Sequence, residues 1–141
     1  MREEYAIQQT LNTYSECTSR ADDTGVLATF TADGIWQIPG IGAKFEGRKA
    51  IAEGMATIRA QFAYVIQVNA PAVITIDGDR ATARSVIHET GKLADRDETL
   101  DILGAYHDDL VRTQEGWKFT CRTFHLAGMY NTTIRPVVLP G

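Results

Sequence analysis

Two neighbouring aspartates and three histidines are the side chains of this sequence best suited to proton transfer. Asp22 and Asp23 follow the end of a predicted helix, and the histidines are His88, His107 and His125. An imidazole titrates near a pH of about 6.5, so it can give or take a proton near neutral pH. A carboxylate beside one ring nitrogen fixes the tautomer and stabilises the imidazolium. The aspartates can serve this purpose or simply cap the next helix.

Helical spacing of apolar residues predicts the elements of the first part of the chain. Its repeat predicts a helix over residues 3–20 with one face against the core. Asp22 or Asp23 then caps a short helix that carries Phe30 and stops at Asp33. A strand with the sequence GIWQI, a loop and a third helix with Ile51, Met55, Ile58 and Phe62 on one face follow.

From residue 63 onward the pattern changes to a period of two, which is typical of strands. Helices followed by strands with short connections predict an α+β fold with a mostly antiparallel sheet. A long antiparallel sheet twists and curls, so we expect a cone-shaped cavity between the sheet and the helices. The predicted strands are residues 63–69, 72–76, 80–90, 99–113 and 116–129.

Length and composition restrict the function further. The 141 residues predict one domain over residues 1–141, and a net charge of −4 with scattered basic residues argues against a nucleic-acid partner. No apolar run approaches the roughly 18 residues of a membrane span, and the N-terminal segment does not resemble a signal peptide. We therefore expect a cytoplasmic protein with no membrane partner. Cys17 and Cys121 have no metal-like spacing and are expected to be reduced.

Several motifs resemble the SnoaL-like branch of the nuclear transport factor 2-like superfamily. They are WQIPGIG at residues 36–42, FEGRKAI at residues 45–51 and GAYHDDLVRTQEGWKF at residues 104–119. The resemblance covers nearly the whole chain and is strongest to scytalone dehydratase and the lindane dehydrochlorinase. It implies an α+β cone around an apolar pocket, a fold that also hosts isomerases, cyclases and non-catalytic binders.

The resemblance also implies site residues. The pocket aspartate of those enzymes corresponds to Asp22, which leaves Asp23 as the helix cap. Their histidine in the strand after the third helix corresponds to Val65, next to Tyr64, so the usual Asp-His pair is broken. A later pocket histidine corresponds to the neighbourhood of His88, which we expect to be the general base with Asp22 as its orienting carboxylate. The alternative is that His88 lies on the outer face of the sheet.

His107 corresponds to a pocket asparagine of scytalone dehydratase. Either His107 or Tyr64 is expected to polarise a substrate carbonyl or to protonate a leaving hydroxyl. It shares a strand face with Ala105, whereas Tyr106 and Asp108 share the other, and only one of these faces can line the cavity. His125 alternates with apolar residues and is expected in the core or at its rim.

Aromatic and apolar residues are expected to line the pocket, although most aromatic residues of a domain belong to its core. The residues expected to bind substrate are Tyr14, Trp36, Phe62, Tyr64, Val65 and Trp117.

Two functions fit this pattern. The first is a lyase or isomerase of the dehydratase type that moves a proton on a small hydrophobic, cyclic carbonyl or hydroxy compound. It needs no cofactor or metal, since nucleotide-binding and metal-binding motifs are absent. The second is a non-catalytic binder of small molecules or a protein similar to a polyketide cyclase. Apolar residues such as Val86 and Val111 on the outer face of the sheet predict a homo-oligomer, and the resemblance suggests a trimer or dimer.

Overall fold

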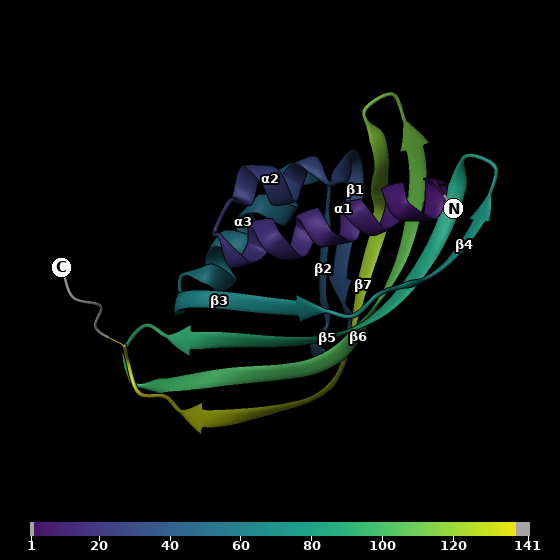
Figure 1. Cartoon of the computed structure of the whole chain (residues 1–141). Coiled ribbons are helices and arrows are strands. Elements are labelled where there is room, and N and C mark those ends of the chain that lie inside the picture. The colour runs from purple at the N-terminus through teal and green to yellow at the C-terminus, as the bar shows by residue number, and fades with distance from the viewer. Residues whose placement is uncertain (1, 138–141) are drawn as a thin grey trace.

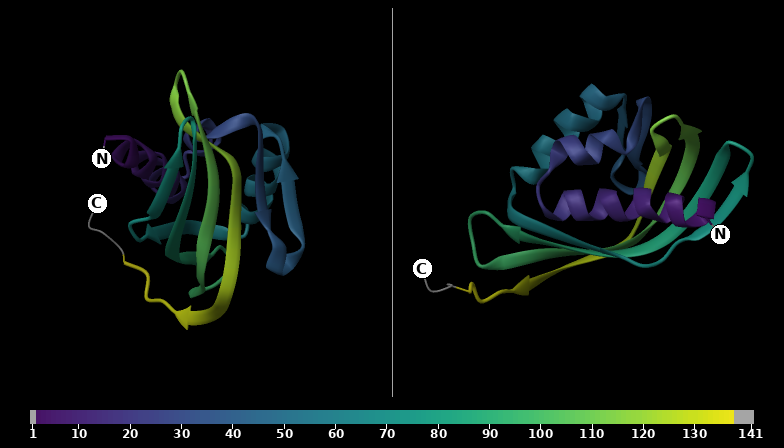
Figure 2. Two further views of the ribbon diagram at one scale, coloured as in Figure 1. Left: turned by 90° about the vertical axis from the view of Figure 1, so that its right-hand side faces the viewer. Right: turned by 45° about the horizontal axis from the view of Figure 1, so that its top comes forward.

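Three α-helices cover the concave face of a seven-stranded sheet in this computed structural model, which describes residues 2–137 (Figure 1). The helices gather on one side, and the sheet bends around them (Figure 2). This confirms the predicted α+β class. Along the chain the elements are α1 (Arg2–Ser19), α2 (Asp23–Ala28), β1 (Phe30–Ile38), a 3-10 turn (Pro39–Ile41), β2 (Ala43–Glu46), α3 (Arg48–Arg59), β3 (Phe62–Asn69), β4 (Val73–Asp77), β5 (Arg80–Leu93), β6 (Glu98–Thr113) and β7 (Gly116–Thr133).

The strands follow the order β2-β1-β7-β6-β5-β3, and β4 pairs with β5 beside β3. All pairs are antiparallel except β1 with β7, which is parallel. Hairpins therefore connect β5, β6 and β7, as the turn residues predict, whereas β1 joins the sheet from the other end of the chain.

The curvature of the sheet comes from irregularities in its longest strands. The β6–β7 register shifts between Leu103 and Gly104 and again between Asp109 and Leu110, and a bulge of this kind bends a strand and increases its twist. Gly104 has no side chain because a Cβ there would collide with the carbonyl oxygen of His125. The bend at this glycine carries the ends of β6 and β7 around the helices.

The core lies between the helices and the concave face. Ile7, Leu11 and Tyr14 on α1 are almost completely buried, as are Phe30 and Phe119. The Phe30 and Phe119 ring centroids are 5.4 Å apart, and Tyr14 meets both rings edge to face. Each buried aliphatic or phenyl side chain contributes about 1.5–3 kcal/mol relative to exposure. This aromatic cluster fixes α1 across β1 and β7.

Two element boundaries differ from those predicted. The short second helix ends at Ala28, and Phe30 begins β1 rather than closing the helix. Phe62 likewise begins β3 instead of belonging to the third helix. Both aromatic residues fit a helical repeat by spacing, but each reaches the interior equally well as the first residue of a strand.

Gly54 of α3 allows that helix to pack on the short strand β2. A Cβ at Gly54 would lie 2.5 Å from the ring of Phe45, which stacks on Trp36 with 5.2 Å between ring centroids. We expect Gly54→Ala to destabilise the protein by about 1–3 kcal/mol through overpacking. In an open helix position the same change would stabilise by about 1 kcal/mol.

Urea denaturation of Gly54→Ala measures this difference. Ala56→Gly on the exposed side of α3 is the control, and it is expected to lose about 1 kcal/mol from helix propensity alone. A Gly54→Ala protein more stable than the wild type would contradict the proposed close packing.

Candidate functional site

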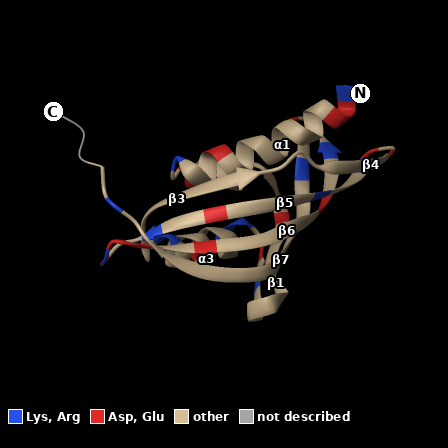
Figure 3. Cartoon of the chain, turned by 60° about the horizontal axis from the view of Figure 1, so that its bottom comes forward, with Lys and Arg blue, Asp and Glu red and all other residues tan. Residues whose placement is uncertain are grey.

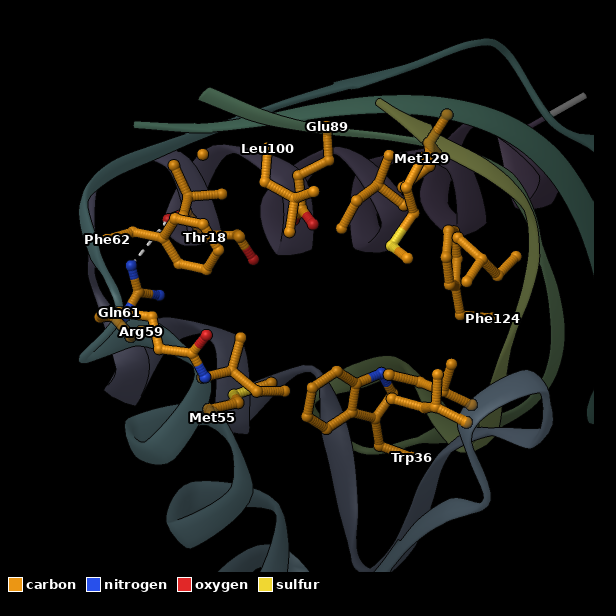
Figure 4. Close-up of a pocket in the computed structure, with 18 of the residues that line it drawn as sticks. Thr18, Trp36, Met55, Arg59, Gln61, Phe62, Glu89, Leu100, Phe124 and Met129 are labelled. Atoms are coloured by element: carbon orange, nitrogen blue, oxygen red, sulfur yellow. Dashed lines mark hydrogen bonds between the residues drawn. The ribbon is translucent and has the colours of Figure 1, made fainter. Parts of the chain in front are cut away.

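A pocket of about 270 Å³ lies between the helices and the concave face of the sheet (Figure 4). This volume is slightly below the range of about 300–1,000 Å³ that is typical of pockets for drug-sized ligands. Most of its wall is apolar, as the sequence predicts for a cavity of this fold. The apolar wall includes Trp36, Met55, Phe62, Val65, Phe124 and Leu126.

Glu89 is the carboxyl group of this pocket. It lies on β5, and its side chain points into the cavity between Leu100 and Met129 (Figure 4). Nε2 of Gln67 donates a hydrogen bond to Oε1 of Glu89 at 3.1 Å. Burial raises the pKa of Glu89, and the hydrogen bond from Gln67 and the charge of Arg59 offset part of this effect. The carboxyl group therefore keeps its proton to a higher pH than an exposed glutamate.

Gln67 on β3 is held in one orientation by its neighbours. Oγ of Ser15 donates to Oε1 of Gln67 at 2.8 Å, which leaves the amide nitrogen as the donor to Glu89. The same nitrogen lies 3.3 Å from the hydroxyl of Tyr106, to which it donates. A buried amide satisfied on both sides has no alternative rotamer of equal energy. Gln67 thus fixes the position of the pocket carboxyl.

An arginine lies beneath the two tyrosines of the pocket. The guanidinium of Arg122 is completely buried, 4.1 Å from the ring centre of Tyr14 and 3.6 Å from that of Tyr106. Its Nε lies 3.1 Å from Oδ1 of Asp108, which is equally buried. Burial raises the pKa of Asp108 to about 7, and Arg122 opposes this rise. Burial also raises the pKa of both tyrosines, so both are neutral hydrogen-bond donors at pH 7.

Arg59 supplies the positive charge at one end of the pocket. It is the last residue of α3, and its Nε and Nη2 contact Oδ1 of Asp23 at 3.0 and 2.8 Å. Its Nη1 donates to the carbonyl oxygen of Thr18 at the end of α1 at 3.3 Å. A carbonyl at the C-terminal end of α1 therefore helps to hold this guanidinium in place.

The two neighbouring aspartates do not take the roles expected of them. Asp22 caps α2, since its Oδ1 accepts a hydrogen bond from the backbone nitrogen of Gly25 at 3.0 Å, and it also contacts Arg20 at 3.4 Å. Asp23, the expected cap, binds the pocket arginine instead. The expectation that Asp22 is the pocket carboxylate is therefore corrected: a residue that closes the first turn of a helix cannot also point away into the cavity.

His88 lies on the outer face of the sheet, the alternative that period-two spacing left open. Its Nε2 is 3.2 Å from Oδ1 of Asp101 and 3.3 Å from the hydroxyl of Tyr130, and its side chain is 44% exposed. The expected meeting of His88 and Asp22 inside one chamber does not occur. The inward residue at this level is the next one along β5, Glu89, because successive side chains of a strand point to opposite faces.

The other two histidines share this outer face. The rings of His107 and His125 lie 4.4 Å apart, and both residues are exposed. His107 therefore does not reach the pocket, and the competing alternative, with Tyr106 and Asp108 facing inward, is what the structure shows. The expectation of a core or rim position for His125 is corrected in the same way: a bulge shifts the register of β7 before this residue.

The expected substrate-binding residues divide into three groups. Tyr14, Trp36, Phe62 and Val65 line the pocket. Tyr64 is 41% exposed and lies on the outer side of β3, since Val65 takes the inward position. Trp117 is buried elsewhere in the core, where its Nε1 donates to Oε2 of Glu3 at 2.8 Å.

Sequence reasoning did not single out three polar residues of the site: Arg59, Gln67 and Glu89. The signal for Glu89 was the alternation of Ala81, Ala83, Ser85 and Ile87, a small and apolar series that continues to it. Arg59 and Gln67 carried no comparable signal. Within residues 2–137, no group of three or more His, Cys, Asp or Glu residues is arranged to hold a metal ion, and no helix is long and apolar enough to cross a membrane.

Comparisons with known proteins agree with this architecture. Residues 1–123 match the model of the SnoaL-like domain, whereas no curated protein matches the sequence. A candidate aromatic ring hydroxylase from Novosphingobium aromaticivorans is 25% identical with a TM-score of 0.86, covering 93% of this chain and 94% of that one. A candidate scytalone dehydratase from the same organism is 21% identical with a TM-score of 0.83 and coverages of 93% and 88%. A type 2 hexachlorocyclohexane dehydrochlorinase is 16% identical with a TM-score of 0.84 and coverages of 97% and 93%.

Removing the buried arginine tests the role of the pair beneath the tyrosines. Arg122→Met leaves Asp108 without a partner, so we expect a loss of about 3–5 kcal/mol at pH 8. The loss should be smaller at pH 5, because protonation of Asp108 then removes the buried charge. The direction follows from a folded pKa of about 7 against an ordinary value of 3.8: a neutral Asp108 stabilises the fold at low pH, and this contribution falls as the pH rises.

Urea denaturation at both pH values measures the two losses. In the Asp108→Leu background, Arg122→Met should lower the free energy of unfolding much less, because no buried carboxylate is then left without a partner. An Arg122→Met penalty that is equal at pH 5 and pH 8 would show that Asp108 does not titrate as described.

Proposed function

This chain belongs to the SnoaL-like family, and we propose that its pocket transfers a proton on a small, largely apolar molecule, with Glu89 as general acid and base. The observation that carries the proposal is a single carboxyl group, held by Gln67, inside a cavity whose wall is mostly apolar. A catalytic group works best when its pKa lies near the working pH, and burial moves the pKa of Glu89 in that direction.

The surrounding donors suit a reaction in which negative charge develops on a substrate oxygen. Tyr14 and Tyr106 line the pocket next to Glu89, and each hydroxyl keeps its proton at neutral pH because burial raises its pKa. A neutral donor in a water-poor site stabilises an enolate or a departing hydroxide more strongly than it would in water. Abstraction of a proton next to a carbonyl, followed by isomerisation or loss of water, fits this arrangement.

The dehydratase type of reaction also agrees with the names of two solved structures that share the fold, a candidate scytalone dehydratase and a hexachlorocyclohexane dehydrochlorinase. Both names describe elimination of a small group from a ring compound. In this chain Glu89 would take the place of a histidine, since Val65 lies at the position where the resemblance puts that residue.

A non-catalytic small-molecule binder is the second candidate function. The same substitution favours it: Val65 is apolar and nearly buried, and all three histidines lie on the outer face of the sheet. A binder would use the pocket without needing Glu89 to change its protonation state.

Proton exchange separates the two functions without knowledge of the natural substrate. We expect the wild type to accelerate exchange of the α-protons of β-tetralone or phenylpyruvate in deuterated water, as followed by NMR. Glu89→Gln should slow the catalysed exchange by roughly 10²–10⁴-fold, because the amide cannot accept the proton. The wild-type rate should rise with pH through the pKa of Glu89, above the ordinary value of about 4.3, since the base must be ionised.

His88→Ala and Asp22→Asn are the matched controls, and both should leave the exchange rate unchanged because neither side chain lines the pocket. Exchange that survives Glu89→Gln would remove Glu89 from the mechanism. A wild type that exchanges neither probe would favour the binder.

The outer face of the sheet is the proposed contact with a second copy of the chain. Ile66, Val68, Val86 and Leu103 are between 42% and 63% exposed there, on three adjacent strands. The strand β3 carries no charged residue, whereas β5 and β6 have charged positions along their length (Figure 3). Monomeric proteins rarely expose several large apolar side chains on one face, and a second copy of the chain offers the same face for burial.

Light scattering after size-exclusion chromatography tests this contact. We expect an oligomer for the wild type and a monomer for Val86→Glu, because a carboxylate in the centre of the contact would be desolvated without a partner. Tyr5→Glu on the exposed side of α1 is the control and should keep the oligomer. A monomeric wild type would exclude the contact.

A further inference from the structure

We propose that the pocket takes a small apolar monoanion, in which a carboxylate or similar acidic oxygen pairs with Arg59 and the apolar body fills the rest of the cavity. This inference rests on the proposed function and deepens it, because it names the class of substrate. Two features of the site carry it: the unused donors of Arg59 and the protonation state of the carboxyl group that shares the cavity.

Arg59 has donors left over for a ligand. A guanidinium carries five N–H donors. Three of them are used inside the protein, by two contacts to Asp23 and one to the carbonyl oxygen of Thr18. The side chain of Arg59 lies at the end of the cavity, beside Gln61, Phe62 and Thr18 (Figure 4). The side chain is 25% exposed, so a ligand can reach it. A planar fork that its neighbours already hold in place is well matched to a carboxylate.

The partner charge of Arg59 lies outside the pocket wall. Asp23 is 40% exposed, so water screens its carboxylate, and Asp23 does not line the cavity. A ligand anion inside the cavity would therefore meet the guanidinium without displacing Asp23. The site offers an arginine that is positioned but still has hydrogen-bonding capacity on its cavity side.

Three other titratable groups line the cavity. They are Tyr14 of α1, Tyr106 of β6 and Glu89 of β5; among the described residues, β1, β3 and β7 contribute none to the wall. Burial raises the pKa of all three groups, which favours their neutral forms. Arg122 lies beneath the tyrosines, and its Nε is 3.1 Å from Oδ1 of Asp108, whose pKa burial raises to about 7.

A bound anion should couple to the protonation of Glu89. Two negative charges in one apolar cavity repel each other, so the anion binds best when Glu89 carries its proton. By linkage, the affinity for an anion falls by up to about tenfold for each pH unit above the pKa of Glu89. A neutral ligand of the same shape shows no such dependence.

The rest of the wall limits the size of the apolar part of the ligand. Leu100 and Met129 lie on either side of Glu89 on the sheet side, and Trp36 closes the opposite side (Figure 4). A cavity of about 270 Å³ accommodates one ring with a short side chain. A phenyl ring linked by two methylenes to the acidic group is therefore a suitable probe.

Calorimetry with four probes that share a phenylpropyl skeleton tests the proposal on the wild-type protein. The probes are hydrocinnamate, its amide, hydrocinnamyl alcohol and hydrocinnamylamine. At a pH of about 6, where the free carboxylic acid is already ionised, hydrocinnamate should bind at least about tenfold more tightly than the amide or the alcohol. The amine should bind most weakly. The advantage of hydrocinnamate should shrink as the pH is raised to about 8.

Three variants identify the groups. Arg59→Gln should lower hydrocinnamate affinity by about tenfold or more and leave that of the alcohol nearly unchanged. Asp23→Asn is its matched control, since it removes the outer partner of Arg59 and keeps the guanidinium, and it should bind hydrocinnamate at least as tightly as the wild type. Glu89→Gln mimics the protonated acid, so hydrocinnamate should still bind, with an affinity that no longer depends on pH.

The outcomes separate this inference from the proposed function. Equal binding of hydrocinnamate and its amide, tighter binding of the amine, or no binding of hydrocinnamate would overturn the monoanion class, and the proton-exchange result would stand on its own. A Glu89→Gln protein that exchanges protons normally would overturn the role of Glu89 in catalysis, while anion selectivity would still stand. Because the comparison of probes uses the wild type, it holds even if a variant fails to fold.

Discussion

The buried guanidinium of Arg122 is the group on which the arrangement of the site depends. Among the described residues it contacts the rings of Tyr14, Tyr106 and Phe119 and the carboxyl of Asp108, and it thereby joins α1, β6 and β7 at one point. Its nitrogens make no hydrogen bond among the described residues, so the aromatic rings and the nearby carboxyl of Asp108 are what stabilise this buried group. Tyr106 in turn bounds the position of Gln67 and so of the pocket acid. Arg122 in the core thus helps to position a series of contacting side chains that ends at Glu89 in the cavity.

The curvature of the sheet decides which residues this network can reach. Along β5 and β6 every second side chain points inward, and the bulge at Gly104 bends the far ends of these strands back over the helices. Inward residues on one side of the bend, such as Asp108, pack in the closed core. Those on the other side, such as Glu89 and Ile102, line the open cavity. One alternating pattern therefore yields both a packed core and a pocket, and the bend separates them.

Much of the fold could be predicted from the sequence because the relevant signals are local. Helical spacing located α1 and α3, alternation located the long strands, and glycine-containing turns located the hairpins. The face of the sheet to which a given strand residue points is not a local property of the sequence. A shift of one residue exchanges its two faces, so His88 and Glu89, or His107 and Tyr106, cannot be told apart without the register. The roles of Asp22 and Asp23 were mistaken for a similar reason. Which of the two caps α2 depends on Arg59, which is distant in sequence and comes near only after folding.

A glutamate and a histidine place different demands on an apolar pocket, and this difference explains the rest of the site. Burial lowers the pKa of an imidazole, so a pocket histidine needs a carboxylate beside it to become a useful acid. Burial raises the pKa of a carboxyl group, so Glu89 approaches neutral pH with only an amide as its partner. A pocket with a glutamate therefore has no need of a second carboxylate, and Asp22 is available to cap a helix. The histidines, without a role in proton transfer inside, can occupy the face that we propose a second copy covers.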